Sequence, residues 1–229
     1  MRHTALFAIL SVFSMSAPCA AQDWQEFNGK ADFFSANFPS PPLVEQITWE
    51  SEYGARVPAR RYAARRGTDS YSVTVVDYNM VKDQLMENAK KCPAGDERCD
   101  GLTAFSGLGY WKQDLRGALV YASFRLMKPD NVKVTYYQWT TGGAGLDTHE
   151  LQLLNTRDQT RTFATIIMHN NLLYVAEATT PVSAPVPNIF TQSLSLLERD
   201  GMRIAHGRVM INACEVDAHE ITAGLDGRR

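Results

Sequence analysis

The chain has 229 residues, 45% of them apolar and 21% charged, and its formal net charge is −2. A chain of this length and apolar content buries a core as a globular protein, which excludes an intrinsically disordered class. The near-balanced charge argues against a nucleic-acid partner, because such proteins carry concentrated positive charge.

The first 21 residues have the features of a secretory signal peptide. One arginine precedes a short apolar run at 5–12, and small residues follow it. That run is too short to span a bilayer, so we expect a Sec-type signal cleaved near Ala21 and a periplasmic or secreted protein. Lipid attachment at Cys19 is the alternative, and Pro18 argues against it. No later apolar stretch approaches the ~18 residues of a transmembrane segment.

Cysteine usage agrees with export. Cys92 and Cys99 flank a polar loop that contains proline and glycine, and an oxidising compartment favours a disulfide between them. Two free thiols are the alternative. Cys214 is then left over, either as a buried residue or as a partner in a bond between chains.

Alternating side chains predict strands in the first part of the expected mature chain. The predicted strands are 33–38, 43–50, 57–65 and 70–78. In the first of them, Phe34, Ala36 and Phe38 share one face, and the prolines of 39–42 end it, since proline cannot donate to a strand ladder. The connection at 66–69 has the length and the glycine of a hairpin.

Two stretches repeat their apolar residues at helical spacing. Val81, Leu85 and Ala89 recur every four residues and predict an amphipathic helix over 80–91. The stretch 111–128 favours a second helix, with a strand around 121–124 as the alternative.

The later part of the chain predicts two hairpins. Strand-like runs at 132–140 and 149–154 flank the glycine-rich stretch 142–145. A third run at 159–169 leads through Asn170 and Asn171 back along 172–178. Asparagine tolerates the positive φ of a two-residue hairpin turn, so we expect that turn here.

A closing helix is predicted over 188–197. It would place four apolar side chains on one face: Ile189, Phe190, Leu194 and Leu197. We expect the single domain to cover 22–200. Residues 201–229 are expected to form a C-terminal extension, with a short edge strand in 202–211 and then a polar tail.

Strands grouped in hairpins, with helices inserted among them, predict an α+β protein with a central antiparallel sheet packed by helices. The aromatic strand that ends at Phe38-Pro39, the hairpins across 43–78 and the path from Asn170-Asn171 to a helix at Phe190-x-x-Ser193-Leu194 carry a resemblance. The chain resembles the PsbP-like fold, an α/β/α sandwich found in the photosystem II extrinsic P protein and its relatives, and small exported bacterial proteins of that plan. The resemblance implies a non-enzymatic accessory role, and it carries over no functional residue.

We expect no catalytic residue, cofactor or metal site. Ser106 and His169 are the candidates if the protein is instead a hydrolase, although Ser106 lacks the glycine two positions earlier that a nucleophile elbow requires. His149, like His169, is a single histidine on a predicted strand, and such residues are usually structural. A zinc site near Cys214 is not reinforced by a second ligand pair.

Arginines give the most concentrated charge in the sequence: Arg56, Arg60, Arg61, Arg65 and Arg66. They form a candidate surface for an anion or a partner, although strand alternation places Arg60 and Arg61 on opposite faces. The alternative is an edge strand protected by charge. Three aromatic residues that could line a small-ligand pocket, or simply pack across strands, are Tyr136, Tyr137 and Trp139.

These observations predict an exported accessory protein that binds a protein or an envelope component without catalysis. A hydrolase and a small-ligand binder are the alternatives, and the oligomeric state stays open.

Overall fold

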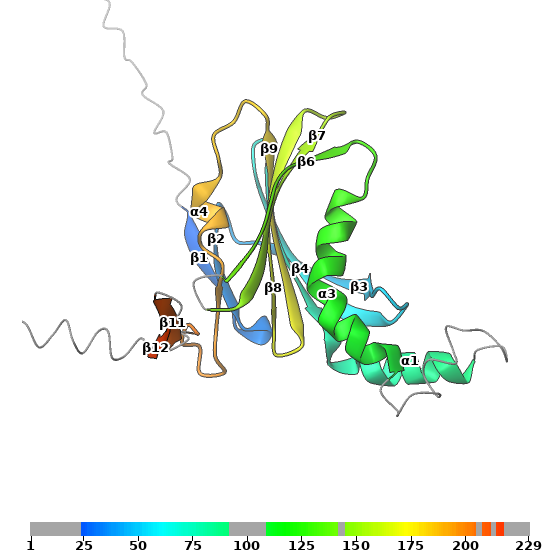
Figure 1. The fold of residues 1–229 in the computed structure, drawn as a ribbon. Helices are drawn as coiled ribbons and strands as arrows, with labels where there is room; N and C mark the ends of the chain where they lie inside the picture. The colour runs from blue at the N-terminus through cyan, green and yellow to red at the C-terminus, as the bar shows by residue number, and fades with distance from the viewer. Residues whose placement is uncertain (1–23, 92–108, 142–144, 205–207, 212–213, 218–229) are drawn as a thin grey trace, which may run out of the picture.

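A central antiparallel sheet of seven strands organises the computed structural model, which describes residues 24–91, 109–141, 145–204, 208–211 and 214–217 (Figure 1). The strand order is β3-β4-β5-β9-β8-β7-β6. The bounds are β3 (Leu43–Glu50), β4 (Arg56–Arg66), β5 (Asp69–Asp77), β6 (Val132–Thr141), β7 (Asp147–Asn155), β8 (Thr160–His169) and β9 (Leu172–Pro181). The predicted α+β class with a central antiparallel sheet is confirmed.

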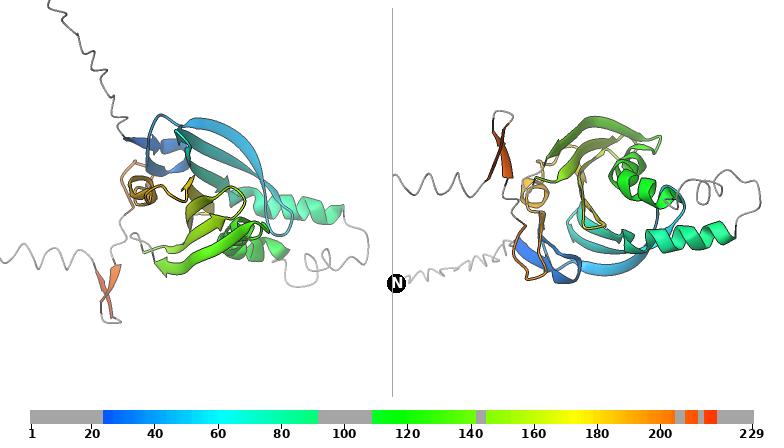
Figure 2. Two further views of the ribbon diagram at one scale, coloured as in Figure 1. Left: turned by 90° about the horizontal axis from the view of Figure 1, so that it is seen from above. Right: turned by 60° about the horizontal axis from the view of Figure 1, so that its bottom comes forward.

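Two layers cover this sheet. The helices α1 (Val81–Lys90) and α3 (Gly109–Met127) lie on one face, and the sheet curves around α3 (Figure 2). The other face carries a small sheet in the order β1-β2-β10 together with the short helix α4. The bounds are β1 (Gln25–Gly29), β2 (Phe34–Phe38), β10 (Ser195–Leu196) and α4 (Asn188–Thr191), with 3-10 turns η1 (Lys30–Asp32) and η2 (Tyr78–Met80).

Strand alternation sends side chains into two separate cores. On the helical face, Val76 and Ile166 pack against Leu85 of α1. On the opposite face, the fully buried Phe34 and Phe38 pack against aromatic and small residues of β4, β5 and β9. The predicted shared face of β2 and the two predicted helices are confirmed.

The β8–β9 hairpin has the predicted turn. Asn170 and Asn171 have φ values of 49° and 61°, the left-handed conformation that a type I′ turn needs. A residue outside the hairpin also bonds to this turn: the backbone N–H of Tyr78 donates to the carbonyl of Asn171 at 2.9 Å. The hairpin is thereby joined to the 3-10 turn at 78–80 that leads into α1.

The predicted closing helix over 188–197 is wrong in length. α4 ends at Thr191, Ile189 is 52% exposed, and β10 pairs with β2. Backbone bonds to the small sheet replace helical ones: the N–H of Leu197 donates to the carbonyl of Phe33 at 2.8 Å. Serine at 193 favours this outcome, since its hydroxyl accepts the backbone N–H of Asn37 at 2.8 Å.

Beyond residue 204 the structure describes two short strands. β11 (Arg208–Ile211) pairs with β12 (Cys214–Asp217) and with no strand of the central sheet. The predicted division into a domain at 22–200 and an extension at 201–229 stays a prediction. None of the helices in the described part of the chain is long and apolar enough to cross a membrane.

Candidate binding cleft

A cleft of about 870 Å³ opens where η1 and the segment after β10 meet the central sheet. Its floor comes from β4, β5 and β9, and its rim from the β8–β9 turn and from residues 197–200. The polar side chains that line it are Asp32, Gln46, Arg60, Asp77, Asn79, His169, Asn170, Tyr174, Glu198, Arg199 and Asp200. We call this feature the cleft.

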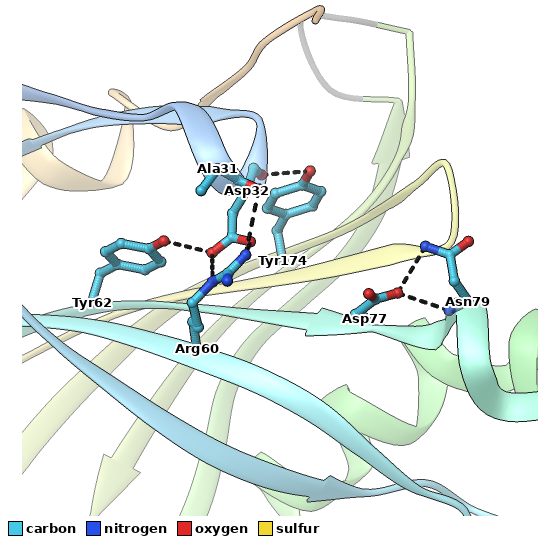
Figure 3. Close-up of polar contacts among 7 residues, drawn as sticks. All are labelled: Ala31, Asp32, Arg60, Tyr62, Asp77, Asn79 and Tyr174. Atoms are coloured by element: carbon cyan, nitrogen blue, oxygen red, sulfur yellow. Dashed lines mark hydrogen bonds and ion pairs between the residues drawn. The ribbon is translucent and has the colours of Figure 1, made fainter. Parts of the chain in front are cut away.

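The carboxylate of Asp32 is the best-connected group in the cleft (Figure 3). Its Oδ2 accepts hydrogen bonds from Arg60 Nε at 2.6 Å and from the Tyr62 hydroxyl at 2.5 Å, and its Oδ1 accepts from Nη2 of Arg60. The Tyr174 hydroxyl donates to the backbone carbonyl of Asp32 at 3.0 Å. Asp32, Tyr62 and Tyr174 are buried and Arg60 is half-buried, so this cluster lies at the floor of the cleft.

The electrostatics of the floor keep its donors protonated. The hydrogen bond with Asp32 raises the pKa of Arg60 well above its ordinary value. Burial, followed by the bond with Asp32, raises the pKa of Tyr62 to about 12, and burial also raises the pKa of Tyr174. The Asp32 carboxylate is therefore surrounded by donors that stay in place at neutral pH, and three of its roughly four lone-pair positions already accept hydrogen bonds.

A strained residue positions this carboxylate. Phe33 follows Asp32 directly and has a φ of 55°, which a bulky residue rarely adopts. Its carbonyl accepts the N–H of Leu197, which fixes the turn against β10. The turn holds Asp32 over Arg60 of β4.

The rim divides into paired and unpaired groups. Asp77 accepts the backbone N–H of Asn79 at 2.9 Å and its side-chain amide at 2.7 Å (Figure 3). Asp200 accepts the backbone N–H of Met202 at 2.9 Å. The side chains of Glu198 and Arg199 are exposed and make no hydrogen bond or ion pair with the described residues.

The predicted arginine surface is divided by the fold. β4 lies between β3 and β5, so the alternative of a charged edge strand is wrong. Arg60 lies in the cleft with its charge matched by Asp32, and Arg61 belongs to the opposite face, as alternation predicts. The anion-binding or partner role of Arg56, Arg65 and the others stays a prediction.

Of the two predicted hydrolase candidates, the structure describes only His169. Ser106, like Cys92 and Cys99, lies outside the described residues. His169 lines the cleft, where its Nε2 is 2.9 Å from the side-chain nitrogen of Asn170. Among the residues that the structure describes, no group of three or more His, Cys, Asp or Glu is placed to hold a metal ion.

A serine that the sequence did not single out lies beside the second histidine. Ser123 Oγ is 2.7 Å from Nδ1 of His149, but both residues are buried, at 1% and 0% exposure. The serine hydroxyl also donates to the carbonyl of Leu119 at 3.0 Å. A nucleophile must be reachable by its substrate, so the buried Ser123 hydroxyl is not placed to act as one.

The three predicted pocket aromatics do not share a pocket. Tyr137 and Trp139 face α3 and contact His149, whereas alternation turns Tyr136 to the opposite face. Trp139 lines a second, smaller cavity there. Asp32 was missed entirely, because no local pattern links it to Arg60.

Fold and cleft together define an α+β protein whose central antiparallel sheet carries a polar cleft with a hydrogen-bonded floor. No protein family model matches the chain, and no curated protein matches it. Among solved structures, it is similar to the cyanobacterial PsbP (CyanoP) from Synechocystis sp. PCC 6803, with 12% identity and a TM-score of 0.43 over 79% of this chain and 96% of that chain. That similarity concerns the arrangement of elements alone, and nothing that PsbP does is transferred to this chain.

Proposed function

We propose that the protein is an exported accessory protein that binds another protein or an envelope component through the cleft, without catalysis. The observation that carries this proposal is the state of the Asp32 carboxylate. Three donors of the protein itself hold its two oxygens, which leaves this carboxylate little capacity to act as a general base on a substrate. A rigid floor of this kind supports recognition.

The rim supports binding. Glu198 and Arg199 place charges of both signs at the mouth, and Gln46 and Asn170 add neutral polar groups. Charged and neutral polar groups of this kind are typical of the solvent-accessible rim of a protein interface. The volume of about 870 Å³ is large enough for several side chains of a partner.

Export rests on the first 21 residues, which lie outside the described part. Cell fractionation and mass spectrometry test it, and the expected product is a periplasmic or secreted chain whose first residue is Gln22. A cytoplasmic protein that retains residue 1 would contradict this part of the proposal.

Site-specific photo-crosslinking in the producing cell tests the cleft. A photoreactive amino acid replaces Asn170 at the rim, and a matched variant carries it at Asn88, which is exposed on α1. We expect a defined adduct from position 170 alone. The captured component is then purified, and it should bind the wild-type protein at least tenfold more tightly than the rim variant E198R/R199E.

Two results would contradict the proposal. The first is an adduct formed equally well from positions 170 and 88. The second is equal affinity of the purified component for the wild-type protein and for E198R/R199E.

A further inference from the structure

A second cavity, of about 420 Å³, lies between α3 and the neighbouring ends of β6, β7 and β8. Its walls are mainly apolar and come from Leu115, Leu119, Val120, Trp139, Leu146 and Met168. Arg116 and Asp147 also line it, and both are exposed. Small organic molecules bind in protein cavities of this size and polarity.

His149 brings a polar group to this cavity from β7. The side chain is 0% exposed, and its Nδ1 lies 2.7 Å from Ser123 Oγ and 3.2 Å from the Tyr137 hydroxyl. Its other ring nitrogen, Nε2, is buried and has no hydrogen-bond partner among the residues that the structure describes. A buried polar atom without a hydrogen-bond partner destabilises a folded protein by about 1–3 kcal/mol, so the presence of this one calls for an explanation.

The Ser123 hydroxyl has one proton and two acceptors in reach, the carbonyl of Leu119 at 3.0 Å and Nδ1 of His149 at 2.7 Å. The tautomer that fits these contacts best carries its hydrogen on Nδ1, which donates to the serine oxygen while the hydroxyl donates to Leu119. The other tautomer would leave a buried N–H at Nε2 without an acceptor. Nε2 is left with a lone pair. Burial lowers the pKa of His149, and the nearby Asp147 carboxylate raises it by a smaller amount. The lowered pKa keeps the ring neutral.

We propose that this cavity binds a small aromatic molecule with one O–H or N–H group, which donates a hydrogen bond to Nε2 of His149. A donor is the chemical group that satisfies a buried lone pair. An aromatic body fits the walls, because Trp139 lines the cavity, lies 5.3 Å from the His149 ring and is still 63% exposed. Stacking on it would cover that ring.

The proposed site is separate from the cleft and does not depend on the function proposed for it. Its residues come from α3, β6, β7, β8 and the segment before β7, and it shares no lining residue with the cleft. A single imidazole also offers too few ligands for a metal ion.

Indole and 1-methylindole are matched probes for this proposal. They have nearly the same aromatic surface, but only indole carries an N–H donor. We expect indole to bind the purified protein about tenfold more tightly than 1-methylindole, measured by NMR titration. The ¹⁵N shifts of the His149 ring should show an unprotonated Nε2 in the free protein and a change at that atom when indole binds.

Three substitutions distinguish an effect on the binding site from an effect on the fold. W139A removes an exposed wall and should weaken indole binding about tenfold, whereas F124A, on the same helix as the cavity wall but outside its lining, should leave it unchanged. H149F, if folded, should bind both probes equally. Equal affinity of the wild-type protein for the two probes, a protonated Nε2, no saturable binding at millimolar indole, or unchanged binding by W139A would each overturn the proposal.

Discussion

Arg60 holds both carboxylate oxygens of Asp32, across 28 residues of sequence and between η1 and the central sheet. The bond from Nε is 2.6 Å long, and the Tyr62 hydroxyl adds a third donor to the same carboxylate. The side chain of Asp32 is 6% exposed and that of Arg60 is 36% exposed. The pair therefore joins the small sheet to the large one at the floor of the cleft.

Removing this carboxylate should destabilise the fold. In D32A the guanidinium and the Tyr62 hydroxyl lose their acceptor in a mostly buried place, and we expect a loss of about 3 kcal/mol in the free energy of unfolding. Urea denaturation measures it. R65A, at an exposed position on the same strand, should change stability by less than about 0.5 kcal/mol. Similar values for the two variants would show that the Asp32 cluster is not structural.

Glycine is required at position 29 because the backbone there lies very close to the ring of Phe34. A Cβ at this position would lie 2.3 Å from Cε1 of Phe34, whose side chain is fully buried. We expect G29A to cost about 2 kcal/mol through overpacking, measured by thermal or urea unfolding. F34L replaces the clashing ring with a shorter aliphatic side chain. G29A should therefore destabilise the F34L variant less than it destabilises the wild-type protein. An equal cost in both backgrounds would contradict a steric cause.

Glu177 makes stability depend on pH. Burial raises its pKa, with Arg61 acting in the opposite direction, and the described residues give its carboxylate no hydrogen bond. A carboxyl whose pKa is raised on folding stabilises the fold below its unfolded pKa of about 4.3, and this stability is lost as the pH rises through the folded pKa.

E177Q should therefore be more stable than the wild-type protein at pH 8, by on the order of 1 kcal/mol, and no more stable at pH 4. Urea midpoints across this range measure the difference. E150Q is the control, because Glu150 is exposed on β7, two strands away in the same sheet, and its substitution should have little effect. A pH-independent difference between E177Q and the wild-type protein would contradict the explanation.

The cysteines give a prediction outside the described residues. If export occurs and Cys92 pairs with Cys99, the mature protein keeps one free thiol, at Cys214. Alkylation without reductant, followed by peptide mass mapping, should label Cys214 alone. Labelling of all three cysteines would show that the disulfide is absent.

Local sequence patterns predicted the elements whose geometry is set locally. The Asn170-Asn171 turn is one, because both asparagines adopt the φ that their side chains tolerate. The alternation of Phe34 and Phe38 is another. The closing helix failed because residues 195–196 pair with β2, a partner distant in sequence, and apolar spacing alone does not distinguish such a strand from a helix.

The cleft could not be predicted for the same reason. Asp32 meets Arg60 only after β4 enters the sheet and Phe33 adopts its strained turn, and neither event has a local signature. The arginine cluster was noticed as charge, but only strand pairing shows that β4 is internal and that Arg60 is neutralised. Pairing with Asp32 thus removes Arg60 from the predicted charged surface, and the role of the other four arginines stays a prediction.

An NMR titration with the partner captured by crosslinking is the decisive test of binding at the cleft without catalysis. We expect amide shifts that saturate at Asn79, Asn170 and Glu198 around the cleft, with the partner recovered chemically unchanged. Shifts confined to α1 and α3, or a partner that is recovered cleaved or modified, would contradict it.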